Sequence, residues 1–178
     1  MNKNLRDIVI STLALAVIGG GVTAALAGTN ALTADRIAAI NEQTATAARQ
    51  AVIDADSFEE ASVAVDGKEV CYHRALKNGS LAGYVFTAAV SGKSSGLVVM
   101  TGIAADGTVT GVEVTEENET AGYVDKVRKA GLFGAFTGKS STDGVDTISQ
   151  ATKTSKGILH GVELALSYYQ TIGKEGET

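Results

Sequence analysis

The clearest pattern along the chain is a long run without charge near its start. No charged residue occurs between Ile8 and Ala34, and the densest apolar part, Ile8–Ala27, is 20 residues long. As a helix, that part would span about 30 Å at roughly 1.5 Å per residue, which is the hydrocarbon thickness of a bilayer. We therefore predict a membrane anchor over residues 1–30.

The flanking charges predict the orientation of this anchor. Lys3 and Arg6 precede the run and few basic residues follow it closely. The positive-inside rule then predicts a single-pass protein of the cell (inner or plasma) membrane, with a cytoplasmic N-terminus and an extracytoplasmic C-terminal domain. A cleaved signal peptide is the alternative, because Ala25–Ala27 resembles an A-x-A cleavage site. The apolar stretch exceeds the roughly 7–15 residues of a typical signal peptide, which favours a retained anchor.

Helical spacing continues after the uncharged run and then gives way to strand-like patterns. Over residues 31–55 apolar and small residues step by three and four, which predicts a juxtamembrane helix with one weakly apolar face. We interpret Asp56–Asp66 as a loop. The dipeptides Asn78-Gly79 and Asp106-Gly107 predict type I′ hairpin turns. They separate four predicted antiparallel strands, near Glu69–Leu76, Leu81–Val90, Gly96–Ala105 and Thr108–Thr115.

The last third of the chain is predicted to be helical and loop-like. An acidic loop, Glu116–Gly122, precedes a short predicted helix over Tyr123–Lys129. A Gly/Ser/Thr-rich loop over Gly131–Asp146 then leads to a predicted helix over Lys153–Ile172, whose apolar positions form one stripe. Strands and helices are segregated, which indicates an α+β fold in residues 56–178, with helices on one face of an antiparallel sheet.

Charge and composition exclude several classes of function. From Asp35 onward the chain carries 13 Lys and Arg against 19 Asp and Glu, which argues against binding to nucleic acid. The single cysteine, Cys71, excludes an internal disulfide framework and a multi-cysteine metal site. Phosphate-loop, zinc-protease and serine-hydrolase motifs are absent from the sequence. His73 and His160 could act as general bases, but lone histidines are more often surface or packed residues.

The most informative segment is Asp146–Lys156, DTISQATKTSK. Locally it is a helix start, with Ser149 or Thr152 as the N-cap. The same geometry suits an anion, because the positive end of the helix dipole and the N–H groups of the first turn attract phosphate. Lys153 and Lys156 add positive charge there. Both interpretations remain open on these residues alone.

The segment also resembles the D-x-x-[ST]-G-A-[ST] motif of the FMN-binding domain family, through Asp146, Ser149, Ala151 and Thr152. Three further stretches resemble that family in order and spacing: Ala105–Val112, Glu119–Gly122 and Gly138–Ser140. Together with the anchor and the length, they make the chain most similar to the G subunits of Rnf electron-transport complexes.

The resemblance implies an FMN covalently linked through its phosphate to Thr152 by a dedicated flavin transferase. It implies that Ser149, Gln150 and Ala151 wrap the phosphate, and that Asp146 serves recognition by the transferase. Glu119, Thr120 and Gly122 would flank the flavin ring. Gln150 stands where the family has Gly, which usually marks a positive φ or a close backbone approach. The identity of this residue therefore bears on both backbone shape and flavin attachment.

The implied function is electron transfer within a membrane-bound, ion-translocating ferredoxin:NAD oxidoreductase. The other membrane subunits of the Rnf complex, the flavin transferase and membrane lipid would be the partners. The flavin would carry the redox chemistry, so this chain needs no catalytic acid or base of its own. Two alternatives remain: the C subunit of the Na⁺-translocating NADH:quinone reductase, and a membrane-anchored extracytoplasmic binding or scaffold module that receives no flavin.

Overall fold

The computed structural model describes residues 3–65, 67–117 and 122–175. The described helices and strands are α1 (Lys3–Val52), β1 (Ser57–Val65), β2 (Lys68–Lys77), β3 (Ser80–Ser91), β4 (Ser95–Ala104), β5 (Val109–Glu117), α2 (Tyr123–Lys129), the 3₁₀ turn η1 (Gly134–Phe136) and α3 (Thr152–Glu175). The chain forms two compact units, residues 1–44 and 45–178. The predicted boundaries of 1–30, 31–55 and 56–178 remain predictions.

The first unit is the greater part of α1, and one segment of it is long and apolar enough to cross a membrane. This segment, Thr12–Ala34, has a mean hydropathy of 1.6, and none of it is buried. Three threonine hydroxyls in it, those of Thr23, Thr29 and Thr33, donate to the carbonyl four residues earlier at 2.8–2.9 Å. These bonds satisfy the hydroxyls inside the helix, as a lipid environment would require.

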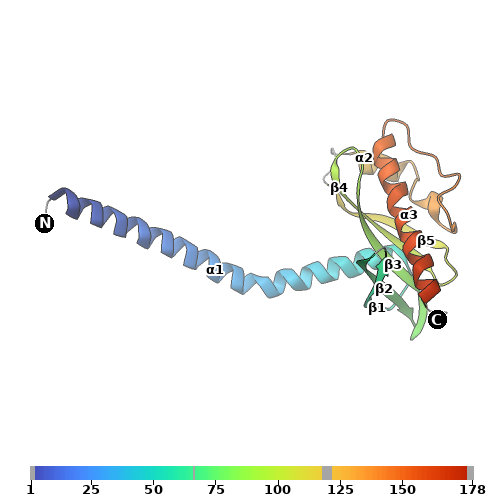
Figure 1. Ribbon diagram of the computed structural model, residues 1–178, viewed down its shortest axis with the longest axis horizontal. Helices are drawn as coiled ribbons and strands as arrows, with labels where there is room; N and C mark the ends of the chain where they lie inside the picture. Colours follow the sequence, from blue (N-terminus) through green and yellow to red (C-terminus); the bar gives the residue numbers. More distant parts are fainter. Residues whose placement is uncertain (1–2, 66, 118–121, 176–178) are drawn as a thin grey trace. The chain divides into compact units, whose positions relative to one another are not determined.

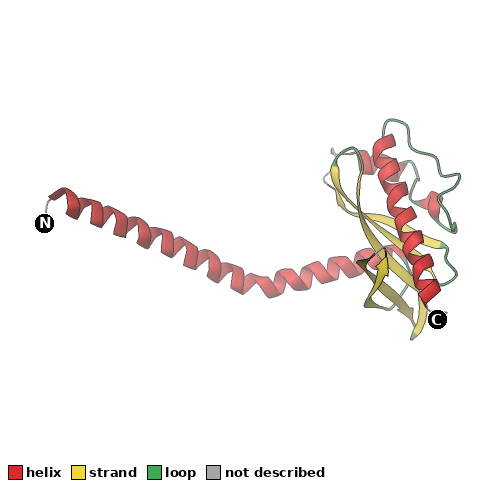
Figure 2. Cartoon of the chain, in the orientation of Figure 1, coloured by secondary structure: helices red, strands yellow, loops and turns green. Residues whose placement is uncertain are grey.

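The second unit is built on a five-stranded antiparallel meander in the order β1-β2-β3-β4-β5, drawn in yellow in Figure 2. The antiparallel sheet is confirmed, but the predicted loop over Asp56–Asp66 is wrong, because β1 occupies most of it and pairs with β2. This segment, SFEEASVAV, shows little alternation, so its pairing depends on the neighbouring strand. The dipeptide Asp66-Gly67, which leads into β2, is the hairpin signal that could have revealed it.

The two predicted type I′ turns differ from each other. Asn78 and Gly79 have φ values of 51° and 75°, as a type I′ turn requires. Among the central residues of the second turn only Gly107 has a positive φ, at 86°, and Ala104 N–H donates to the Thr108 carbonyl. That is a three-residue loop closed by a glycine, so the hairpin is confirmed and its turn type is corrected.

The larger core lies between the sheet and α3, which packs across β3 and β4 (Figure 1). The helix contributes Ile158, Val162 and Ala165, each at most 1 % exposed. The sheet contributes alternate residues such as Phe86 and Val99. This packing confirms the amphipathic stripe predicted for the last helix, because its apolar positions are those that meet the sheet.

The opposite face of the sheet carries a second, smaller core. There the end of α1 places Val52, and the next residue Ile53, against Val85 and Met100. The predicted arrangement, with helices on one face only, is therefore wrong for the end of α1. The strands are apolar on both faces, so alternation alone could not reveal whether helices cover one face of the sheet or both.

Glycines bring the backbone of Val52 close to this face. A Cβ on Gly111 would lie 2.9 Å from the Val52 Cα, and one on Gly102 would lie 2.8 Å from its carbonyl carbon. A bulge in β5 leaves Thr110 beside Gly111, and the Thr110 hydroxyl donates to the Val52 carbonyl at 2.5 Å. The end of α1 is therefore held through its main chain.

Candidate functional site

The site begins where the loop before α3 turns into the helix. Ser155 is buried, and its hydroxyl accepts a hydrogen bond from Ile148 N–H at 3.1 Å and donates one to the Ala151 carbonyl at 3.0 Å. Ala151 N–H in turn donates to the Ile148 carbonyl at 3.0 Å. These bonds tie the turn over residues 148–151 to the first turn of the helix.

The residue just before α3 is Ala151, which lacks a side-chain hydroxyl. The prediction that Ser149 or Thr152 caps the helix is therefore wrong: Thr152 is the first helical residue, and Ser149 lies within the preceding turn. Both side chains are exposed. Ser155, inside the helix, ties down the preceding turn instead, so the hydroxyl of Thr152 remains at the surface.

Gln150 adopts the backbone conformation expected for a glycine at its position. Its φ is 67°, one of two positive values among the non-glycine residues that the structure describes. An L-residue with a side chain is strained in this left-handed region. The Gln150 side chain is also engaged, because its Oε1 accepts a hydrogen bond from the Lys126 ammonium at 2.7 Å. Gln150 thus keeps the positive φ that a glycine at this position would mark, and Lys126 links this turn to α2.

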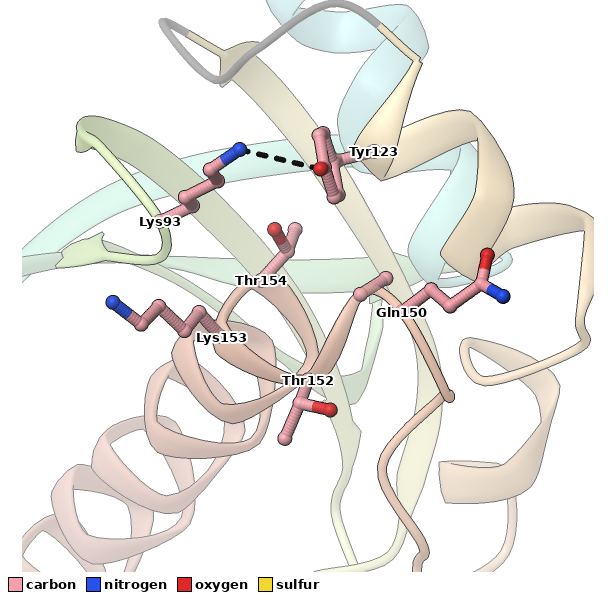
Figure 3. Close-up of a pocket in the computed structure, with 7 residues that line it drawn as sticks. Lys93, Tyr123, Gln150, Thr152, Lys153 and Thr154 are labelled. Atoms are coloured by element: carbon pink, nitrogen blue, oxygen red, sulfur yellow. Dashed lines mark hydrogen bonds between the residues drawn. The ribbon is translucent and has the colours of Figure 1, made fainter.

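A cleft of about 260 Å³ opens at the start of α3 (Figure 3). Its lining residues are Lys93, Tyr123, Gln150, Ala151, Thr152, Lys153 and Thr154. A second hollow, of about 290 Å³, is lined by Gly122, Tyr123, Lys126 and Gln150. The two hollows share Tyr123 and Gln150, so together they form a groove between α2 and the first turn of α3.

The side chains around the cleft point in different directions (Figure 3). Thr154 is fully buried and points toward Lys93 and Tyr123, whereas Thr152 points away from them. The Lys93 ammonium lies 3.2 Å from the Tyr123 phenol oxygen and 4.5 Å from the centre of its ring. Thr152 therefore stands at the rim with its hydroxyl accessible, while an aromatic ring and a cation form the opposite wall.

The structure brings together four of the seven residues predicted for the cofactor. Gln150, Ala151 and Thr152 line the cleft, and Gly122 lines the adjoining hollow. Ser149 is exposed and belongs to neither lining. Glu119 and Thr120 lie outside the described residues.

The sequence interpretation missed four residues of the site, Lys93, Tyr123, Lys126 and Thr154. Tyr123 directly follows the Glu119–Gly122 stretch, so its place in the motif could have marked it. Lys93 has no local signal, because it comes from the hairpin between β3 and β4.

The other candidates for chemistry lie outside the cleft. Cys71, an exposed free cysteine, and His73 both line a separate hollow between β2, β3 and α3. His160 is an exposed residue with Nδ1 3.7 Å from Glu163. Among the described residues no group of His, Cys, Asp and Glu is placed to hold a metal ion.

Comparison with known protein sequences assigns the chain to a family. The sequence profile of the FMN-binding domain matches residues 92–167, which contain the cleft. A relative from Acetobacterium woodii, the G subunit of the Na⁺-translocating ferredoxin:NAD⁺ oxidoreductase complex, is 32% identical over 91% of each chain. The chain belongs to the G-subunit family of Rnf complexes. A second relative, the G subunit of the ion-translocating oxidoreductase complex of Aliivibrio fischeri, is 28% identical over 94% of this chain and 93% of its own.

Membership of the G-subunit family confirms the resemblance inferred from the motifs, and the groove suits FMN in its chemistry. FMN combines an aromatic ring system with a phosphate. Tyr123 offers an aromatic surface, while Lys93 and Lys153 supply positive charge beside the N-terminus of a 24-residue helix. The residues present therefore fit the cofactor named by the family.

Proposed function

We propose that this member of the G-subunit family is an electron-transfer protein whose FMN is joined through a phosphodiester to Thr152. The observation that carries the proposal is the exposed hydroxyl of Thr152 at the rim of a cationic, aromatic groove. When bound, FMN would supply the redox chemistry, and the chain would position it. An accessible hydroxyl is what a separate flavin transferase needs in order to attach the cofactor.

The residues of the groove have separable roles. The N-terminus of α3 and Lys153 favour the phosphate electrostatically. Ser149, Gln150 and Ala151 wrap the phosphate, and Ala151 contributes shape, because its N–H already donates to Ile148. Glu119, Thr120 and Gly122 flank the flavin ring, and Asp146, which is exposed, is available to the transferase.

The setting of the protein follows from its relatives and its first helix. The Acetobacterium relative is named as part of a Na⁺-translocating ferredoxin:NAD⁺ oxidoreductase complex. We infer that this chain joins the other membrane subunits of such a complex. The Thr12–Ala34 segment anchors it in lipid as a single pass, and Lys3 and Arg6 hold its N-terminus in the cytoplasm.

Intact mass after co-expression with a flavin transferase tests the attachment. We expect an increase equal to FMN less one water, and a fluorescent band after denaturing electrophoresis. A mass without this increase would favour the scaffold alternative, for which Gln150 at the glycine position is the specific observation. Co-purification distinguishes the remaining alternative, because a C subunit would associate with an NADH:quinone reductase.

Extraction by carbonate tests the anchor. We expect the full-length chain to stay in the membrane fraction at high salt and in carbonate. A mature N-terminus mapped at or just after Gly28 would show a cleaved signal peptide and would contradict the anchor.

A further inference from the structure

The hairpin between β3 and β4 is held tightly against α3, and it carries Lys93. Gly157 makes this approach possible, because a Cβ there would lie 2.8 Å from the Ser91 carbonyl oxygen and 3.1 Å from the Gly92 Cα. Gly92 N–H also donates to the Ser94 carbonyl at 3.1 Å across the turn. The main chain around Lys93 is therefore fixed relative to the first turns of the helix.

The Lys93 side chain lies over an aromatic ring, although lysines are strongly hydrated. Its ammonium lies 4.5 Å from the centre of the Tyr123 ring and donates to the phenol oxygen at 3.2 Å. Both groups face the cleft, on the side away from the Thr152 hydroxyl (Figure 3). The wall opposite the attachment residue thus presents an aromatic surface and one cation together.

We propose that Lys93 is the cation that faces the flavin ring at Tyr123 and raises the reduction potential of the flavin; this inference rests on the proposed function. Reduction adds electrons to the ring system, and a positive charge held nearby stabilises the reduced form more than the oxidised form. Lys93 is exposed, so solvent and salt weaken this effect but leave its sign unchanged. Tyr123 provides the surface on which a planar ring stacks, and its hydroxyl holds the ammonium beside that surface.

A phosphate contact is the competing role for Lys93. The structure favours the ring, because Thr152 points away from Lys93 and α3 already supplies Lys153 in its own first turn. A lysine that serves the phosphate would change how much flavin is attached. A lysine that serves the ring would change the potential of the flavin that is attached.

The test is a spectroelectrochemical titration of the full-length flavinylated protein and of its Lys93→Gln variant. We expect attachment to persist and the equilibrium constant for one-electron reduction to fall about tenfold, which is ~59 mV. Lys93→Arg keeps the charge and should retain most of the potential. Lys129→Gln is the matched control, because Lys129 is exposed and lines neither hollow.

Each result decides between the two roles. The inference is overturned if the flavin attached to Lys93→Gln has an unchanged reduction potential. It is also overturned if this variant attaches less flavin at unchanged potential, or attaches none, since either loss would assign Lys93 to the phosphate. An equal shift in Lys129→Gln would show a general surface-charge effect and would also overturn it. Wild-type protein that takes up no flavin would overturn the proposed function itself, and the inference with it.

Discussion

Two helix ends in the second unit are fixed by opposite means. The C-terminus of α1 is buried, and its last carbonyl, that of Val52, accepts a hydrogen bond from the Thr110 hydroxyl. Gly102 and Gly111 lie directly against the main chain of Val52. The N-terminus of α3 is open, with Thr152 and Lys153 exposed at a cleft. One end has its last carbonyl bonded within the protein, whereas the other presents its first turn to a ligand.

The comparison separates stability from function. A helix end that is closed by the protein offers nothing to bind, but any disturbance of it should change the free energy of unfolding. An open helix end contributes little packing at its exposed positions, and it keeps its dipole and N–H groups for an anion. Substitutions at the first end should therefore affect folding, and substitutions at the second should affect the cofactor.

The largest expected effect is at the open end. Thr152→Ala should abolish covalent FMN, because alanine has no hydroxyl to form the phosphodiester. The free energy of unfolding should stay within about 0.5 kcal/mol, since the side chain is exposed. Intact mass and denaturant unfolding measure the two quantities, and Thr152→Ser is the control that keeps a hydroxyl. Flavin still covalently bound in the alanine variant would remove Thr152 from the site.

At the closed end, Gly102→Ala should destabilise the second unit by about 1–3 kcal/mol, the usual cost of overpacking. Its new Cβ would lie 2.8 Å from the Val52 carbonyl carbon, and main-chain atoms cannot rotate away. Denaturant unfolding of the full-length protein in detergent measures the change. Gly134→Ala is the matched control, because a Cβ there has no atom within 4 Å. Equal stability of the two variants would show that the glycine contact is unimportant.

A smaller effect is expected at the bond that satisfies the same helix end. Thr110→Val keeps the shape of the side chain and removes the hydroxyl that donates to the Val52 carbonyl. We expect a loss of about 1 kcal/mol, which is typical of one hydrogen bond. The same unfolding experiment measures it, with the exposed Thr137→Val as control. A neutral result would mean that water replaces the hydroxyl at this position.

The smallest effect returns to the open end. Gln150→Gly should relieve the backbone strain of a positive φ at a residue with a Cβ, and so stabilise the protein by at most about 1 kcal/mol. It should also accept FMN at least as well as the natural sequence, which intact mass can follow. Asn78→Gly is the control and should gain less, because asparagine adopts this conformation more readily. A clear loss of flavin in Gln150→Gly would show that the Lys126 bond to its side chain matters more than the backbone.

The sequence predicted a region well where the interactions that order it are local along the chain, and poorly where they join distant segments. The four strands after residue 68 were predicted because their turns and alternation are local. The first strand was missed, because its nine residues are ordered by pairing with β2 rather than by their own pattern. The motif also pointed to a positive φ at Gln150, since a glycine position carries a backbone requirement with it.

By itself, the sequence determined the uncharged run, the hairpins, the apolar stripe of α3 and the motif that ends in Thr152. These depend on residues a few positions apart, where helical or strand periodicity and turn chemistry act directly. Only the tertiary structure decided that Lys93 and Tyr123 face the start of α3, and that Gly102 and Gly111 contact the end of α1 on the other face of the sheet. Such contacts join distant segments, and they follow from how the strands and helices pack rather than from any local pattern.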